Sequence, residues 1–433
     1  MSSKPQIRLL VATLVLVGPW AVAGMARAEE TCEECHAEQR VPFVRDPVQM
    51  LERSVHGEVG LHCSDCHGGR PDEPTVRAHD RAAGFRPRFV AETMTSLCGD
   101  CHASLDRMSQ FDSDLPTDQL SQYQASHHGI MFASSHADSF EAGNPRAASC
   151  VTCHGAHNIL RVRDVHSSVN PAHVADTCGR CHADPQIGGA AGLPIDQERQ
   201  WRHSVHGRAH VDWVNKGQPE SEDPHPPTCN DCHDDHAMTG RERAGYACAS
   251  CHQAEWESFE DGPHGAAFER LGFMPCVDCH GSHEVEEVDA SIIGIERDTT
   301  CRRCHAPGQP EYDAASRMGD MQREAEAEAR RAREMMEAVK DEPQPAELPE
   351  LLEAMERAEH DMRNAVHALD EGRIEETAQA VAQASAHIIA VLPEPDDGSR
   401  RHRAILWSLG AGALLLLLAG LYVGARFMNR RRS

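Results

Sequence analysis

Residues 149–157 read Ser-Cys-Val-Thr-Cys-His-Gly-Ala-His and contain the motif that dominates the chain. This motif is C-x-x-C-H, in which two cysteines separated by two residues are followed directly by histidine. It occurs nine times, and the nine copies use all 18 cysteines of the 433-residue sequence. We number the copies units 1 to 9 in chain order: Cys32, Cys35 and His36; Cys63, Cys66 and His67; Cys98, Cys101 and His102; Cys150, Cys153 and His154; Cys178, Cys181 and His182; Cys229, Cys232 and His233; Cys248, Cys251 and His252; Cys276, Cys279 and His280; and Cys301, Cys304 and His305.

The spacing within each unit suits the covalent attachment of c-type haem. Two thiols one helical turn apart can form thioether bonds to the two vinyl groups of one porphyrin. The histidine that follows is then held beneath the ring as the proximal iron ligand. C-x-x-C alone also serves zinc binding and redox chemistry, but zinc does not need a histidine directly after every second cysteine. The nine units therefore predict nine covalently bound haem c groups.

The two ends of the chain predict export and a membrane anchor. Residues 1–28 have a basic start, a short apolar stretch and an Ala-x-Ala cleavage site, which is typical of a secretory signal rather than a first membrane helix. Residues 404–425 carry no formal charge and would form a helix about 33 Å long, enough to cross a bilayer. We expect residues 393–403 to be a linker and residues 426–433 an Arg-rich cytoplasmic tail, because the haem units must lie on the periplasmic face of the inner membrane.

The composition supports a haem-filled interior. Acidic residues number 68 against 42 basic ones, and the resulting formal charge of −26 excludes nucleic acid as a partner. Aromatic residues make up only 4% of the chain, which is too few for an ordinary large core. We expect porphyrin rings to supply much of the buried apolar volume, so that haem ligation and folding are one event.

With its nine units over residues 32–305, the chain resembles the multihaem c-type cytochromes, particularly those built from doubled C-x-x-C-H repeats. The resemblance implies haems packed edge to edge as a path for electrons, with iron commonly held between two histidines. The expected fold is mostly α with much irregular loop, and residues 29–310 form the nonahaem cytochrome c domain.

An internal repeat indicates candidates for the second, distal histidine of each iron. After unit 1, the other eight units fall into four pairs, and a His-Gly precedes each pair. In three pairs a further histidine follows the first motif histidine by three residues; Arg70 takes that place in the first pair, where His79 is preferred over His62 as the substitute. The candidates are His56, His128, His206 and His264, then His157, His236 and His283, and finally His79.

One iron of the nine lacks a ranked distal ligand. The unranked alternatives are His62, His127, His136, His166, His173, His203, His210 and His225. For any single histidine, a solvated position in a loop is the competing interpretation. The same imidazole chemistry at a repeated position favours ligation instead.

Residues 311–392 predict a helical hairpin or three-helix bundle between the haems and the membrane. Apolar residues recur in steps of three and four over residues 348–369, which is typical of packed helices. The methionines at this spacing are interpreted as core residues rather than haem ligands. His360 and His367 lie off the apolar seam, so they face either solvent, the default interpretation, or the haem region.

The leading functional hypothesis is an electron carrier rather than an enzyme. It would relay electrons in a respiratory chain between a membrane-bound quinol dehydrogenase or other redox protein and a terminal reductase or soluble electron carrier. The alternative is a multihaem oxidoreductase that acts on nitrite, hydroxylamine or tetrathionate at one iron with an open position. No unit ends in lysine, the mark of ammonia-forming nitrite reductases, and no tyrosine lies in an evident crosslinking motif.

Overall fold

The computed structural model describes residues 31–89, 91–134, 148–218, 224–240, 245–297 and 299–393. Helices are the only regular structure in these ranges, which confirms the expected α class. The predicted signal peptide, membrane helix and tail lie outside the described residues, as does the predicted linker beyond residue 393. Within the described ranges, no helix combines the length and the apolar character needed to cross a bilayer.

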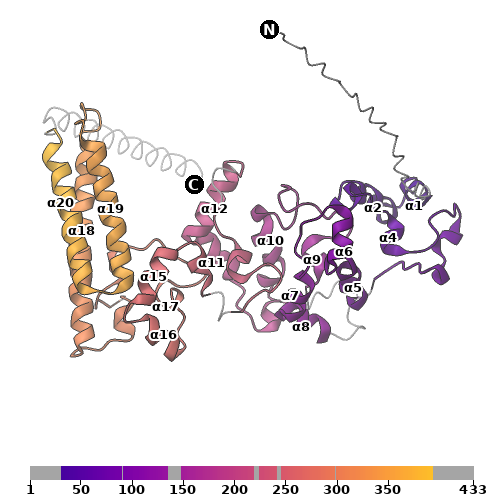
Figure 1. Cartoon of the computed structure of the whole chain (residues 1–433), viewed down its shortest axis with the longest axis horizontal. Coiled ribbons are helices and arrows are strands. Elements are labelled where there is room, and N and C mark those ends of the chain that lie inside the picture. The colour runs from indigo at the N-terminus through magenta and orange to yellow at the C-terminus, as the bar shows by residue number, and fades with distance from the viewer. Residues whose placement is uncertain are drawn as a thin grey trace, which may run out of the picture.

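The haem region consists of short helices joined by irregular segments (Figure 1). Its α-helices are α1 (Thr31–Ala37), α2 (Pro42–Glu52), α3 (Val55–Glu58), α4 (Cys63–His67), α5 (Ala91–His102), α6 (Leu105–Met108), α7 (Gln119–Ala125), α8 (His127–Ser134), α9 (Cys150–His154), α10 (Pro171–His182), α11 (Gln197–His203), α12 (Val205–Asn215), α13 (Cys229–His233), α15 (Gln253–Asp261), α16 (Gly265–Leu271) and α17 (Val277–His280). Short 3-10 turns are η1 (Val76–His79), η2 (Arg81–Ala83), η3 (Ser109–Phe111), η5 (Gly189–Ala191), η7 (Ala247–Ser250), η8 (Ala290–Ile292) and η9 (Cys301–Arg303).

Each C-x-x-C-H unit lies on or beside one of these short helices. Units 1 to 6 occupy α1, α4, α5, α9, α10 and α13, unit 8 borders α17, and units 7 and 9 begin on η7 and η9. A helical turn brings residues i and i+3 to one side, so the two thiols of each unit can face the same porphyrin. All eighteen cysteines are described, and none of them forms a disulfide.

Apolar side chains are distributed unevenly between the two parts of the molecule. The two hydrophobic clusters found in the described residues lie from Ile292 onward. In contrast, the large apolar side chains that are exposed all fall between Val41 and Val288, with Phe43 82% exposed. The described residues of the haem region therefore bury fewer large apolar side chains in a common cluster than the bundle does. The distribution therefore agrees with a haem region whose core is completed by its cofactors.

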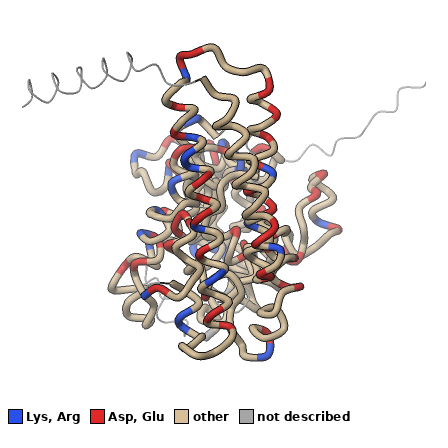
Figure 2. Tube along the Cα trace, turned by 90° about the vertical axis from the view of Figure 1, so that its left-hand side faces the viewer, with Lys and Arg blue, Asp and Glu red and all other residues tan. Residues whose placement is uncertain are grey.

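Three long helices form a bundle at the C-terminal end of the described chain. They are α18 (Pro310–Ala338), α19 (Leu348–Ala368) and α20 (Glu371–Val391), which stand side by side across the long axis of the molecule (Figure 1). Met355, Val381 and Ile388 are almost completely buried between them. Acidic and basic residues are interspersed along the helices of the bundle (Figure 2). The bundle thus has the ordinary hydrophobic core that the haem region lacks among its described residues.

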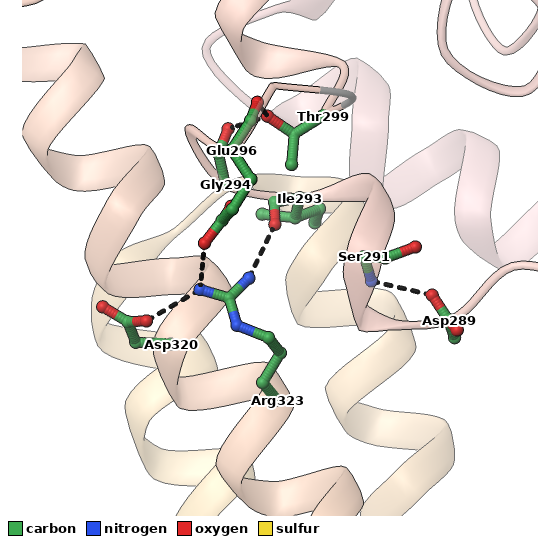
Figure 3. A network of polar contacts seen from close by, with 8 residues as sticks. All are labelled: Asp289, Ser291, Ile293, Gly294, Glu296, Thr299, Asp320 and Arg323. Carbon is green, nitrogen blue, oxygen red and sulfur yellow. Dashed lines mark hydrogen bonds and ion pairs between the residues drawn. The ribbon is translucent and has the colours of Figure 1, made fainter.

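The bundle is joined to the end of the haem region by a polar network (Figure 3). The Arg323 guanidinium of α18 pairs with Glu296 at 2.9 Å and donates to the Ile293 carbonyl at 3.3 Å. The Thr299 hydroxyl donates to the Gly294 carbonyl at 2.7 Å and closes the same loop. Beside this network, Ile293 packs with Met318, Ala365 and Ile374 in one hydrophobic cluster. These contacts fix where α19 meets the haem region.

Candidate functional site

The proximal histidine of every unit is paired with a second histidine. Ring centroids in the nine pairs are 5.9 to 6.3 Å apart. In unit order the pairs are His36 with His79, His67 with His157, His102 with His56, His154 with His236, His182 with His128, His233 with His283, His252 with His206, His280 with His367, and His305 with His264. All eight distal histidines predicted from the repeat lie in this set.

The spacing of the pairs fits an iron held between two imidazoles. A bond of about 2 Å from each nitrogen to the metal, plus roughly 1 Å from each nitrogen to its ring centre, separates the two centroids by about 6 Å. Direct hydrogen bonding between the two rings would bring them closer. The part of the chain that is described holds no group of three or more His, Cys, Asp or Glu side chains arranged around a single metal ion. Each unit thus offers two histidines for an iron and two cysteines for the vinyl groups of a porphyrin, which are the residues that haem c requires.

The electrostatics of the pairs favour the neutral imidazole that binds iron. In every pair, burial lowers the pKa of one member, and the partner imidazole is the next cause. These members are His36, His157, His56, His154, His128, His283, His206, His280 and His264. A lowered pKa keeps these rings deprotonated near neutral pH, and only the deprotonated ring nitrogen can bind metal.

Backbone carbonyls orient several of the rings. Nδ1 of His67 lies 2.8 Å from the Arg86 carbonyl, and Nδ1 of His233 lies 3.1 Å from the Thr239 carbonyl. A ring that donates its Nδ1–H to a carbonyl presents Nε2 as the free ligand atom. The chain therefore selects the tautomer that a proximal histidine requires.

Three of the four recurring His-Gly positions share one local structure. In the copy before unit 6, the Ser204 hydroxyl donates to the Trp201 carbonyl at 2.7 Å and accepts from the Gly207 amide at 3.0 Å. The serine thus ends α11 and caps α12 in one step, and His206 emerges in the first turn of α12. Ser54 and Ser126 make the equivalent contacts before units 2 and 4.

Glycine follows these histidines because the backbone passes too close for a side chain. A Cβ on Gly207 would lie 2.0 Å from the Trp201 carbonyl oxygen. The same construction at Gly57, Gly129 and Gly265 gives 2.1, 2.0 and 2.3 Å to a carbonyl oxygen of the preceding helix. The His-Gly motif is therefore a steric requirement of the turn that presents the histidine.

The histidine pairs connect the units by a regular rule. The second unit of each pair of units takes its partner histidine from the His-Gly that precedes that pair of units, as His252 does with His206. The first unit takes its partner from the next pair along the chain, as His67 does with His157. Unit 1 behaves like a first unit, because His79 belongs to the pair that follows it. Neighbouring repeats therefore interlock through their histidines.

Cysteine contacts place consecutive units next to one another. Cys98 and Cys150, Cys178 and Cys229, and Cys248 and Cys276 lie near enough to shift one another's pKa, which places units 3 and 4, 5 and 6, and 7 and 8 next to one another. Burial, followed by the neighbouring Cys178, raises the pKa of Cys153 to about 11 and so connects units 4 and 5. The units thus follow one another in space as they do in sequence.

The structure distinguishes the two cysteines of a unit, which the motif treats alike. The first cysteine is half-buried in all nine units. The second cysteine is half-buried in units 3, 4, 5 and 8 and exposed in units 1, 2, 6, 7 and 9. The half-buried second cysteines are Cys101, Cys153, Cys181 and Cys279, and the exposed ones are Cys35, Cys66, Cys232, Cys251 and Cys304.

Four second cysteines have hydrogen bonds to residues close by in the sequence. The Cys101 sulfur accepts from Arg107 at 4.0 Å, the Cys251 sulfur accepts from the Ser250 hydroxyl at 3.9 Å, the Cys35 carbonyl accepts from Gln39 at 3.1 Å, and the Cys304 amide donates to the Cys301 carbonyl at 3.2 Å.

The first and second cysteines of a unit therefore differ in exposure: the first is half-buried in all nine units, whereas the second is exposed in five of them. Haem attachment at the second cysteines therefore stays a prediction of the motif. A porphyrin joined to both thiols would cover the exposed sulfurs.

The unranked alternatives lie elsewhere. His62 contacts Glu33 at 3.1 Å, His173 lies 2.8 Å from the Val165 carbonyl, and His210 packs between Trp201 and Trp213. Among the described histidines of this group, the structure pairs none with a proximal histidine; His136 lies outside the described residues. The ninth partner is His367, for which the sequence favoured a solvated position. The repeat could have indicated this histidine. Unit 8 is the first unit of the last pair of units, so its distal histidine has to come from beyond unit 9.

Comparison with known proteins agrees with these features. Residues 247–330, which contain units 7 to 9 and part of α18, match the family model described as cytochrome c554 and c-prime. No curated protein and no solved structure matches the chain. The family match supports a c-type cytochrome, which binds haem covalently and transfers electrons through its iron.

Proposed function

We propose that this protein is a membrane-anchored electron carrier with nine bis-histidine haem c groups. The observation that carries the proposal is the pairing of all nine proximal histidines with a second imidazole at about the same spacing. Haem iron bound there supplies one-electron cycling between iron(III) and iron(II). The chain would hold each iron between the two imidazoles of a pair, and burial keeps one imidazole of each pair deprotonated.

A linear path for electrons is supported by the order of the units. The close cysteine contacts between units 3 and 4, 5 and 6, and 7 and 8 join neighbouring pairs of units, and the looser contact between units 4 and 5 lies within a pair. The haem region is also elongated, with α1 at one end and α15 to α17 next to the bundle (Figure 1). Electrons would enter at one end of such a row and leave at the other.

Coordination of each iron by two histidines favours an electron carrier over an enzyme. A reductase for nitrite, hydroxylamine or tetrathionate needs an iron with an open position for its substrate. Two imidazoles per iron leave no such position. The absence of a C-x-x-C-K unit in the sequence points the same way.

The proposed setting is the periplasmic face of the inner membrane, with residues 404–425 as a single-pass anchor. The partners would be a membrane-bound quinol dehydrogenase or other redox protein and a terminal reductase or soluble electron carrier. The formal charge of −26 favours a soluble partner with a positive docking face. Deleting residues 404–433 should release the protein from membranes into the periplasmic fraction.

Spectroscopy of the oxidised full-length protein tests the carrier function. Haem quantification should give nine haems per chain, and electron paramagnetic resonance together with optical spectra should show all of them low-spin. A high-spin haem that binds nitrite or hydroxylamine would overturn the proposal in favour of the enzyme. A stoichiometry below nine would contradict the cofactor count.

A further inference from the structure

The interlocking rule leaves one iron without a ligand from the haem region. Units 2, 4 and 6 take their partners from the next pair, at His157, His236 and His283. Unit 8 is the first unit of the last pair, so no further repeat follows it. The ring paired with its histidine, His280, is His367 of α19 in the bundle.

We infer that the bundle terminates the haem array by replacing the missing next repeat, with His367 as the distal ligand of the unit 8 iron. This inference rests on the proposed bis-histidine function. It changes the role of the bundle, which then forms part of the electron-transfer unit and is more than a spacer between haems and membrane.

The geometry of His367 is that of the other distal histidines. Its ring centroid lies 6.0 Å from that of His280, and the two ring planes are 24° apart. Its Nδ1 lies 2.7 Å from the Arg363 carbonyl one turn earlier in α19. Donation of the Nδ1–H to this carbonyl leaves Nε2 as the ligand atom. The side chain is half-buried, as expected for a residue between two parts of the molecule.

Packing on both sides of His367 holds α19 against the haem region. A Cβ on Gly262, at the end of α15, would lie 2.5 Å from the Ala368 carbonyl oxygen, so the two backbones are in direct contact. Two residues before His367, Ala365 is fully buried in the cluster that contains Ile293 of the haem region. The Arg323 network lies beside this cluster (Figure 3). The position of the imidazole is therefore set by tertiary contacts as well as by the helix.

The other histidine of α19 provides a matched control. His360 lies seven residues, or about two helical turns, before His367. It is exposed, and its Nε2 lies 3.3 Å from the side-chain amide of Asn364. Replacing it removes an imidazole of the same helix without touching unit 8.

The test compares His367→Ala, His360→Ala and the unaltered full-length holoprotein. Covalent attachment should keep nine haems in all three. His367→Ala should convert one of the nine low-spin haems to high-spin, and added imidazole should restore the low-spin spectrum. His360→Ala should leave all nine low-spin. An all-low-spin spectrum for His367→Ala would overturn the inference, whereas a high-spin haem in the unaltered protein would instead contradict the proposed function.

A second variant covers the case in which His367→Ala does not accumulate. His367→Met keeps a side chain that can bind iron, and methionine ligation raises the reduction potential of a haem. One of the nine midpoint potentials in a redox titration should therefore move upward. Nine unchanged potentials would contradict ligation by residue 367.

Discussion

The Cα of Gly207 approaches the carbonyl oxygen of Trp201 so closely that a Cβ would lie 2.0 Å from it. This contact lies directly beside His206, the predicted distal ligand of unit 7. Gly207→Ala should force α11 and α12 apart, destabilise the fold by about 1–3 kcal/mol and displace His206. Optical and paramagnetic resonance spectra should then show one high-spin haem. Gly240→Ala is the control, because a Cβ there has open space around it.

Removal of the His206 imidazole itself should produce the same spectral change without the steric clash. In His206→Ala we expect eight low-spin haems and one high-spin haem that binds carbon monoxide after reduction. His203→Ala is the matched variant, since His203 is exposed and its Nδ1 lies 2.7 Å from the Arg199 carbonyl of its own helix. Identical spectra for the two variants would refute the pairing of His206 with His252.

Removal of haem should affect the folding of the haem region and of the bundle differently. If the chain is produced without haem attachment, the haem region is expected to stay unfolded, because its exposed apolar side chains and histidine pairs need the cofactor. The bundle has its own hydrophobic core and should keep its helices. Hydrogen exchange measured by mass spectrometry would show protection confined to α18, α19 and α20. Protection spread over the haem units would show that they fold without haem.

Ile374 links bundle stability to the position of His367. Its side chain is fully buried and packs in the same cluster as Ala365. Ile374→Ala should lower the free energy of unfolding by about 2–5 kcal/mol. It should also make imidazole ligation at unit 8 weaker, so that the high-spin signal rises with temperature before the other haems change. Glu375→Ala, at an exposed neighbouring position, should change neither the melting temperature nor the spectra.

The sequence predicted the local features well and the long-range pairing poorly. The C-x-x-C-H units, the helical class and the segment of long helices follow from spacing and periodicity within short windows. Seven of the eight distal candidates followed from repetition, as at Ser204-Val205-His206-Gly207, and His79 was the substitute in the irregular first pair. Which histidine meets which iron depends on contacts about 90 residues apart, as for His67 and His157, and periodicity carries no information at that distance.

His367 shows the same limit more sharply. It stands outside any repeated motif, and a single half-buried histidine on a charged helix is most often solvated. Only the packing of α19 against Gly262 and Ile293 brings its ring beside His280. That tertiary contact is not encoded in the spacing of α19, which predicts the bundle core alone.

The interlocking of the repeats has a consequence for biogenesis. A chain exported N-terminus first presents its units one after another, yet the first unit of each pair receives its distal histidine only when the next pair has emerged. Coordination of the iron by its distal histidine would therefore follow haem attachment, and each new pair of units would supply the distal histidine for the pair before it. For unit 8 the distal histidine, His367, would emerge last, shortly before the predicted membrane anchor at residues 404–425.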